Sequence, residues 1–250
     1  MKGIHRVLVL AAVLPLAAES VAQPPEEAVS AVVGVNHAPP YRDLEGEAPS
    51  GLYIDIFLAL AERMGWQAEF REAPFRRALK MAEDGEVDIL LGPQRTDARS
   101  RFLAFVDPLF PPEPKLFFYL SPDHEVRRYE DLAGKRIGVL DKASYFPEFD
   151  KDDSLIKEPA PRYENLMLML EKDRVDVVIA PELIGVDASR STGVNARVAP
   201  YRVPGSESFL VISRQSPLIE QTDRIHQAVA ELKDSGVIQE LMAQYRTPGD

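Results

Sequence analysis

The 250-residue chain contains no cysteine, and this absence excludes several kinds of chemistry. Disulfide bonds, thiolate nucleophiles, cysteine-ligated zinc and a lipid-modified N-terminal cysteine all require that residue. Histidine is scarce as well, with four in the whole sequence. His37, His124 and His226 lie far apart, with no carboxylate or second histidine at metal-ligand spacing. The sequence therefore predicts no metal site.

Two short motifs that mark large groups of enzymes are also missing. The sequence has no Gly-x-Ser-x-Gly nucleophile elbow and no phosphate-cradling Gly-x-x-x-x-Gly-Lys loop. We therefore expect a protein that is not an enzyme, and we predict neither catalytic residues nor a cofactor.

Basic residues are in deficit. Lys and Arg number 29 against 40 Asp and Glu, which gives a formal net charge of −11. An acidic surface repels nucleic acid and anionic membranes, and it favours a soluble, monomeric state. We expect a monomer without a nucleic-acid partner.

One apolar run near the N-terminus is the longest in the sequence. The run Val7–Ala18 follows basic residues at positions 2 and 6, and it is well short of the roughly 20 apolar residues of a membrane span. Small residues at Ser20 and Ala22 provide a cleavage site. We expect residues 1–22 to be a signal peptide cleaved after Ala22, which implies a periplasmic protein. A retained signal anchor is the alternative, which the break at Pro15 disfavours.

Two segments of the chain repeat one local pattern. Leu79–Pro93 and Leu168–Pro181 each contain the end of an amphipathic helix, a polar turn, a Val-Asp step, a short apolar strand and a proline. A helix that leads into a buried strand, occurring twice, indicates two α/β lobes. In α/β proteins the carboxyl ends of parallel strands form the cleft that holds a ligand. The sequence thus predicts a ligand site between two lobes.

The first lobe is expected to follow the order strand, helix, strand, helix, strand. Gly65 stands where a helix C-cap belongs, and Pro74 stands where the next helix begins. A continuous apolar segment then predicts a buried parallel strand. The expected elements are a strand over 31–35, a helix from Ile54 to Gly65, a strand over 66–70, a helix over 74–84 and a strand over 88–91.

Proline-bearing segments mark the expected connections between the lobes. We interpret Phe110–Pro114 as the first connection, because a stretch so rich in proline is not expected to join a central strand. Pro200–Gly205 suggests the return, after which Phe209–Ser213 is expected to re-enter the sheet of the first lobe. The predicted boundaries are 28–111 plus 208–250 for lobe 1 and 115–204 for lobe 2, each lobe with its own sheet.

Four groups of residues along the chain match one known family. The groups are Gly51–Ile56 with Met64-Gly65, Thr96–Arg99 with Phe105–Phe110, Glu130–Val139, and Ser216–Leu218 with Gly236–Tyr245. In order and in spacing they resemble the motifs of family 3 extracellular solute-binding proteins, and they cover nearly the whole chain that follows the signal peptide.

This resemblance implies a fold and a function. The family has a two-lobed periplasmic-binding-protein-like fold of type II, in which each lobe is a mixed sheet flanked by helices and a cleft lies between the lobes. Its members capture small polar solutes, often amino acids, and pass them to a membrane transporter. The chain is therefore expected to deliver a small polar, carboxylate-bearing solute to an inner-membrane permease of an ABC-type importer.

Two alternatives to transport are open at this point. The same bilobed module supplies ligand signals to membrane kinases, and delivery and sensing need the same closure around a ligand. A few relatives with this fold are dehydratases, and Glu182 paired with Arg99 or Lys142 would supply an acid and a base.

Arg99 is the first candidate for ligand binding. In the family that the chain resembles, an arginine at this position forms a bidentate pair with the α-carboxylate of the ligand. Gln94 matches a position that is usually Ser or Thr and that also contacts this carboxylate. The alternative for Arg99 is a surface arginine in a charged turn, because Arg95 and Arg101 flank it.

Ser144 is the expected counterpart in the second lobe. It follows a predicted strand and precedes a predicted helix, where free amides and a hydroxyl form an anion site. The family often has a glycine and two hydroxyl residues here, whereas this chain has Lys142, Ala143 and Ser144. Helix capping is an equally good account of Ser144.

The chain departs from the family pattern at Pro181. Amino-acid binders of the family place an aspartate just after this strand, where it accepts hydrogen bonds from the α-ammonium group. Glu182 is the candidate substitute, one residue further on. The segment Pro74–Arg77 resembles a Pro-aromatic-x-Arg subgroup, and Arg76 or Arg77 beside the cleft would favour a more anionic ligand. Two solvated arginines on a helix face are the alternative.

Aromatic side chains and a strand end supply the remaining candidates. Tyr41, Phe75 and Tyr145 are expected to wall the pocket, because aromatic faces commonly enclose ligands in clefts. Membership of the core is the alternative for each. Asn36 ends the first strand at the edge of the sheet that faces a ligand.

Overall fold

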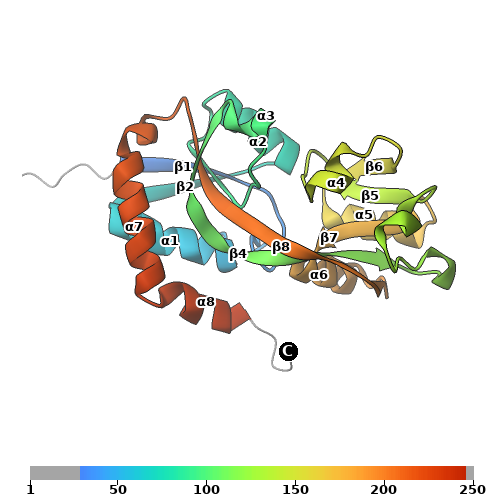
Figure 1. Ribbon diagram of the computed structural model, residues 1–250. Coiled ribbons are helices and arrows are strands. Elements are labelled where there is room, and N and C mark those ends of the chain that lie inside the picture. The colour runs from blue at the N-terminus through green and yellow to red at the C-terminus, as the bar shows by residue number, and fades with distance from the viewer. Residues whose placement is uncertain (1–28, 246–250) are drawn as a thin grey trace, which may run out of the picture.

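Two long antiparallel strands, β4 (Leu103–Tyr119) and β8 (Arg197–Ser213), run between two groups of α/β elements and join them (Figure 1). The computed structural model describes residues 29–245. The expected signal peptide, residues 1–22, lies outside this range. No helix within the described range is long and apolar enough to cross a membrane.

The first lobe contains the elements near both ends of the described chain, and the second lobe contains those between β4 and β8 (Figure 1). The first lobe consists of β1 (Val29–Val35), α1 (Leu52–Met64), β2 (Trp66–Glu72), α2 (Phe75–Glu83), β3 (Ile89–Leu91), α3 (Asp97–Ser100), η3 (Pro217–Gln221), α7 (Thr222–Asp234) and α8 (Val237–Tyr245). The second consists of η1 (Pro122–His124), η2 (Tyr129–Leu132), β5 (Arg136–Leu140), α4 (Pro147–Lys151), β6 (Ile156–Ala160), α5 (Tyr163–Glu171), β7 (Val177–Pro181) and α6 (Glu182–Thr192).

The strands are hydrogen-bonded in the order β2-β1-β3-β8-β4-β7-β5-β6 as one 8-stranded mixed sheet. The expectation that each lobe has a sheet of its own therefore needs correction. Both connecting segments are extended and antiparallel, so they pair with each other and carry the hydrogen bonding from lobe to lobe. The expected re-entry of Phe209–Ser213 is present, since Leu210 of β8 pairs with Leu91 of β3.

The expectation that Phe110–Pro114 cannot join a central strand is wrong, because this stretch lies inside β4, between β7 and β8. Register shifts interrupt its pairing with β8, and the prolines of the stretch are not among the paired residues, whereas Glu113 pairs with Ser206. Prolines are tolerated at such bulges because no ladder hydrogen bond is needed there. Gly205 permits the close approach of the two strands, since a Cβ at this position would lie 2.6 Å from the Glu113 nitrogen.

Local sequence explains where two helices of the first lobe end and begin. α1 is terminated by Gly65, whose φ of 66° lies in the left-handed region and whose N–H donates to the carbonyls of Ala61 and Glu62. Glycine adopts this conformation without a steric penalty, as the sequence predicts. Pro74 is the N-cap of α2, where its missing N–H costs no helical hydrogen bond.

The repeated Val-Asp step forms the same pair of hydrogen bonds in each lobe. Asp88 donates its N–H to the Val32 carbonyl and accepts the Val32 N–H on Oδ2, both at 2.8 Å. Asp176 donates its N–H to the Arg136 carbonyl at 2.8 Å and accepts the Arg136 N–H on Oδ2 at 2.7 Å. Each aspartate thus fixes one parallel strand against its neighbour, so that the carboxyl ends of the strands meet the space between the lobes.

The role of Asp88 can be tested by substitution. Asp88→Ala removes the acceptor of the Val32 N–H and also that of the Ser216 hydroxyl, which donates to Oδ1 at 2.6 Å. We expect the free energy of unfolding, measured by urea denaturation, to fall by about 1–3 kcal/mol. Asp153→Ala, at an exposed turn, is the matched control and should change it by less than about 0.5 kcal/mol. An Asp88→Ala variant as stable as the parent would contradict this role.

Candidate functional site

A cavity of about 80 Å³ lies between the two lobes, beside the carboxyl ends of β3 and β5. We call it the interlobe cavity, and we call β4 and β8 together the β4–β8 ribbon. Side chains of both lobes and of the ribbon line it. They are Arg42, Tyr53, Phe75, Gly92, Pro93, Gln94 and Arg99 of the first lobe, Leu140, Ala143, Ser144, Tyr145, Tyr163, Pro181 and Ile184 of the second, and Glu113, Lys115 and Ser208 of the ribbon.

Arg99 links the two lobes across this cavity. It lies on α3, whose N-cap Thr96 accepts the Arg99 N–H at 3.2 Å, and its side chain is buried at 7% exposure. Its Nη1 donates to the Gln94 carbonyl at 2.9 Å, and its Nη2 donates to the Lys142 carbonyl of the second lobe at 2.8 Å. The guanidinium also lies 5.4 Å from the centre of the Phe75 ring. Burial lowers the pKa of Arg99 to about 10.

The loop that faces Arg99 has an unusual backbone. Lys142 has φ 63°, a left-handed conformation that is uncommon for residues other than glycine, and its carbonyl accepts from Arg99. The polar groups that follow are already bound within the second lobe. The Ser144 hydroxyl donates to the Asp150 carboxylate, and the Tyr145 N–H donates to Asp150 Oδ1 at 3.0 Å. This contact is not helix capping, because the N-cap of α4 is Phe146, which has no side-chain cap hydrogen bond.

Arg42 lines the first-lobe wall of the cavity. It is 8% exposed, and it donates from Nε to the Asn36 carbonyl at 3.2 Å and from Nη1 to the Leu91 carbonyl at 3.1 Å. Both acceptors lie at the carboxyl ends of β1 and β3, where the chain leaves the sheet. The guanidinium lies 5.4 Å from the centre of the Tyr53 ring, and burial lowers the pKa of Arg42.

Glu113 and Lys115 enter the cavity from the irregular part of β4. Residues two apart on a strand face the same side, which accounts for their common direction. Lys115 is 5% exposed and donates to the Glu113 carbonyl at 3.0 Å, and burial lowers its pKa. Glu113 is 6% exposed, and its Oε1 accepts the Leu183 N–H at 2.7 Å. Burial raises the pKa of Glu113 to about 7.

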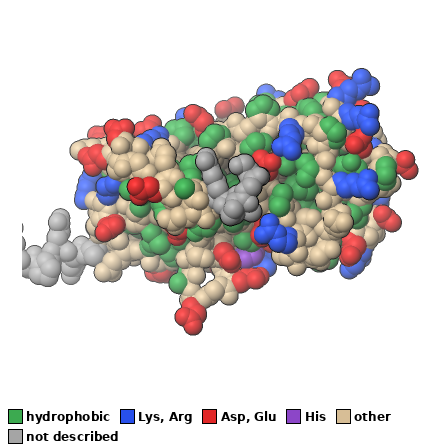
Figure 2. Space-filling view, turned by 90° about the horizontal axis from the view of Figure 1, so that it is seen from below, with side chains coloured by type: hydrophobic (Ala, Val, Ile, Leu, Met, Phe, Trp, Pro, Cys, Tyr) green, Lys and Arg blue, Asp and Glu red, His purple; other side chains and the backbone are tan. Residues whose placement is uncertain are grey.

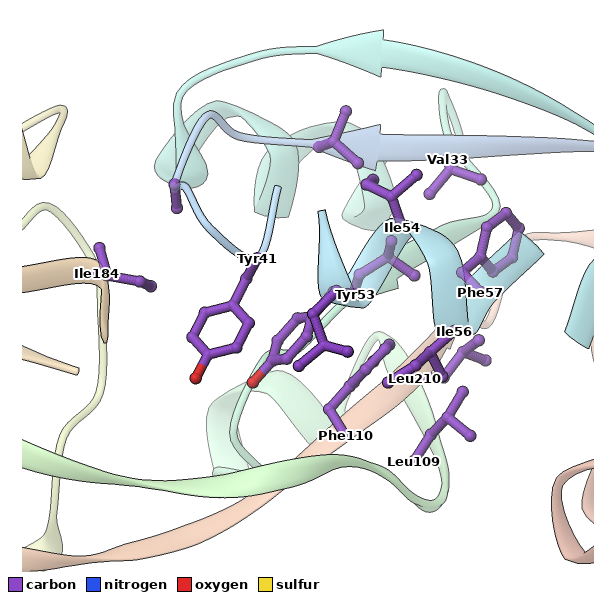
Figure 3. Packing of buried hydrophobic residues seen from close by; sticks show 14 of the residues in the cluster. Val33, Tyr41, Tyr53, Ile54, Ile56, Phe57, Leu109, Phe110, Ile184 and Leu210 are labelled. Atoms are coloured by element: carbon purple, nitrogen blue, oxygen red, sulfur yellow. The ribbon is translucent and has the colours of Figure 1, made fainter. Parts of the chain in front are cut away.

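An aromatic row supports this wall from behind. The Tyr41 and Tyr53 ring centres are 4.5 Å apart, and the Tyr53 and Phe110 rings stack at 4.2 Å. Figure 3 shows the three rings side by side, with the two tyrosine hydroxyls pointing to the same side, away from core residues such as Phe57. In the second lobe the Tyr145 hydroxyl accepts the Leu140 N–H at 2.8 Å, which fixes that ring at the end of β5.

The structure gathers some of the sequence candidates at the cavity and places others elsewhere. Arg99, Gln94, Phe75 and Ser144 line it, and Tyr145 does so as well. The Gln94 side-chain amide hydrogen-bonds the Ser206 hydroxyl at 2.6 Å, at the edge between cavity and solvent.

The remaining candidates do not line the cavity. Tyr41 and Asn36 are buried next to it, at 3% and 7% exposure. Glu182 pairs with Arg202 at 3.2 Å, and Arg77 pairs with Glu86 at 2.9 Å, both among exposed side chains.

Sequence reasoning missed six lining residues with polar side chains, of which Arg42, Glu113 and Lys115 carry charge. Each had a weak signal. Arg42 follows the proline-rich turn after β1, at the edge of the sheet where Asn36 was a candidate. Glu113 and Lys115 are charged residues with the spacing of a strand, inside the stretch interpreted as a connection. The other three are Tyr53, Tyr163 and Ser208.

The fold and the cavity together define a two-lobed α/β binding protein. The family model of bacterial extracellular solute-binding proteins, family 3, matches residues 31–248. The chain belongs to this family, so the resemblance seen in its motifs is confirmed.

Named relatives agree with this placement. The arginine-binding extracellular protein ArtP of Bacillus subtilis (strain 168) is 23% identical over 217 residues, which are 83% of this chain and 82% of that protein. The structure of an ancestral arginine-binding protein bound to arginine has a TM-score of 0.75 at 21% identity, over 87% of this chain and 98% of that one. A histidine kinase sensor domain with similarity to periplasmic binding proteins has a TM-score of 0.71 at 19% identity, over 88% and 96%. These structures confirm the two-lobed periplasmic-binding-protein-like fold.

The buried carboxyl group of Glu113 predicts a pH dependence of stability. Folding raises the pKa of Glu113 to about 7. Its contribution to the free energy of unfolding is therefore fully present below the unfolded pKa near 4.3 and is lost as the pH rises through about 7. Between about pH 5 and about pH 8 the parent should lose about 3 kcal/mol of unfolding free energy that Glu113→Gln does not lose. Urea denaturation at both pH values measures this difference, with Glu182→Gln as the control. Equal pH slopes for the parent and Glu113→Gln would contradict the assignment.

Proposed function

We propose that the protein captures a small carboxylate-bearing solute in the interlobe cavity and delivers it to an inner-membrane permease of an ABC-type importer. The hydrogen bond from Arg99 to the Lys142 carbonyl carries this proposal. It brings a buried guanidinium of the first lobe to the second, so a ligand bound there contacts both lobes. The family supports the class of function. The arginine in the name of the B. subtilis relative also carries an α-carboxylate.

The proposal includes the division of the chain into moving parts. Lobe 1 comprises 28–111 plus 208–250, and lobe 2 comprises 115–204. The register shifts of β4 between Phe105 and Lys115 interrupt its ladder with β8, and they supply the flexible part of the ribbon about which the lobes close. Contacts between the two lobes, such as that of Arg76 with Asp141 at 3.4 Å, would break when the cleft opens.

The proposal also covers where the protein is located, its oligomeric state and the absence of catalysis. Removal of residues 1–22 after export leaves a periplasmic monomer, in keeping with a family of extracellular proteins. The named relatives are binding proteins, which supports a role without catalysis.

Arg99 is the proposed anchor of the ligand's carboxylate. Loss of one partner of a desolvated arginine–carboxylate pair costs about 2–5 kcal/mol of binding. Arg99→Ala should therefore weaken binding of a confirmed ligand by about 30-fold or more, measured by calorimetry. Arg99→Lys should recover part of the loss, because an ammonium cannot make the forked contact.

Arg101→Ala is the matched control for this experiment. Arg101 follows α3 and is exposed, so its loss should change the affinity by less than about twofold. Tight binding by a folded Arg99→Ala variant would contradict the proposed anchor.

A sensory role is the second candidate, favoured by the likeness to a histidine kinase sensor domain. Transport and sensing need the same closure, so the site does not separate them. Genes for a permease and an ATPase beside the gene for this protein support import, and a gene for a membrane kinase supports sensing.

A further inference from the structure

We infer that the ligand carries two acidic groups, one held by Arg99 and the other by Arg42 together with Lys115. This inference rests on the proposed function and names the class of solute as a small dicarboxylic acid. It differs from arginine, to which the names of the B. subtilis relative and of the ancestral binding protein refer.

The cavity holds an excess of buried positive charge. Arg42, Arg99 and Lys115 are 8%, 7% and 5% exposed, and each donates hydrogen bonds to backbone carbonyls. Within residues 29–245 none of the three forms an ion pair with an acidic side chain. Glu113 is the one carboxylate among the lining residues of this range. Positive groups therefore outnumber negative ones by two even when Glu113 is ionised.

This excess is local, since the rest of the molecule has the opposite balance. Acidic and basic side chains are interspersed over the face shown in Figure 2. Exposed arginines pair with carboxylates, as in Arg77 with Glu86 at 2.9 Å and Arg136 with Asp176 at 2.6 Å. A buried cation without an anion is costly, and burial accordingly lowers the pKa of all three cavity groups. An anionic ligand removes this cost.

The three cations form two subsites rather than one. Arg99 donates to the Gln94 and Lys142 carbonyls, between α3 and the loop of the second lobe. Arg42 donates to the Asn36 and Leu91 carbonyls at the ends of β1 and β3, and Lys115 donates to the Glu113 carbonyl on β4. Two acidic groups on one solute match these two sets of contacts.

A basic side chain does not fit the second subsite. A ligand guanidinium there would face Arg42 and Lys115, with Glu113 as its single opposing charge. The volume also selects for size. A cavity of about 80 Å³ favours a small acid over a ligand with a long side chain.

Calorimetry with paired ligands tests the inference. Each diacid is compared with its monoamide: succinate with succinamate, L-aspartate with L-asparagine and L-glutamate with L-glutamine, with L-arginine in addition. We expect at least one diacid to bind about 30-fold or more tightly than its monoamide, because the monoamide leaves one subsite without an anion. L-Arginine should bind more weakly than that diacid.

Variants separate the second subsite from the first. Lys115→Met should reduce the preference for diacid over monoamide by about tenfold, because the diacid loses an ion pair where the monoamide loses a hydrogen bond to a neutral amide. Arg99→Ala should weaken both. Lys151→Met, at an exposed lysine outside the cavity, is the matched control. The urea midpoint of each variant checks that it is folded.

The pH dependence of the affinity distinguishes two classes of diacid, those without an amino group and those with one. Glu113 faces Arg42, Lys115, the Tyr41 hydroxyl and the Leu183 N–H. A dicarboxylate without an amino group should bind with proton uptake by Glu113 and lose affinity above about pH 7. An acidic amino acid whose ammonium contacts ionised Glu113 should instead gain affinity as the pH rises toward about 7 and keep it above pH 7.

The outcomes are distinguishable. No preference for any diacid over its monoamide, or L-arginine binding as tightly as the best diacid, would overturn this inference and leave the proposed capture of a carboxylate in place. Failure of every acid in the panel to bind would overturn the proposed function as well.

Discussion

The antiparallel pairing of β4 with β8 is the interaction on which the rest of the molecule depends. It joins the lobes into one sheet, and its irregular part brings Glu113 and Lys115 to the interlobe cavity. A regular ladder would have no place for the prolines of this stretch, and a free connection would leave the two charged side chains in solvent. The bulged strand accommodates the prolines and also holds the two charged side chains at the cavity, because it stays paired while its register shifts.

The electrostatics of the cavity follow from this arrangement. Lys115 pairs with Pro181 of β7, and Pro181 stands where the amino-acid binders that the chain resembles have an aspartate. Lys115, a cation of the proposed second subsite, is therefore the β4 neighbour of the position at which the resemblance implies an acid. Glu113, with its pKa raised to about 7 by burial, can accept from an ammonium or donate to a carboxylate. The preference for a second acidic group thus rests on Arg42 and Lys115 rather than on Glu113.

Local pattern was enough to predict the parts of the fold that depend on neighbours in sequence. The glycine after α1, the proline before α2 and the repeated helix–strand joint are all present. The repeat also has a physical reason that sequence alone did not supply, because Asp88 and Asp176 each clamp a neighbouring parallel strand. Arg99 could be found because it lies in a family motif and faces the cavity from a short helix.

The parts that sequence did not predict depend on long-range pairing. Phe110–Pro114 contains prolines, which disfavour a strand. The stretch is nevertheless part of a strand, because β8 and β7 pair with its flanks. Arg42 is 49 residues from the Leu91 carbonyl that it contacts, so no local pattern marks it as a lining residue. Arg77 was a candidate because Pro74–Arg77 resembles a Pro-aromatic-x-Arg subgroup, and its pairing with Glu86 depends on the turn after α2.

A crystal structure of the protein with a bound diacid tests the central claim most directly. The account predicts a ligand in the interlobe cavity with one carboxylate about 2.7–2.9 Å from the Arg99 guanidinium and the other at a similar distance from Arg42 and Lys115 Nζ. A diacid bound through Arg99 alone, with its second carboxylate in solvent, would contradict it.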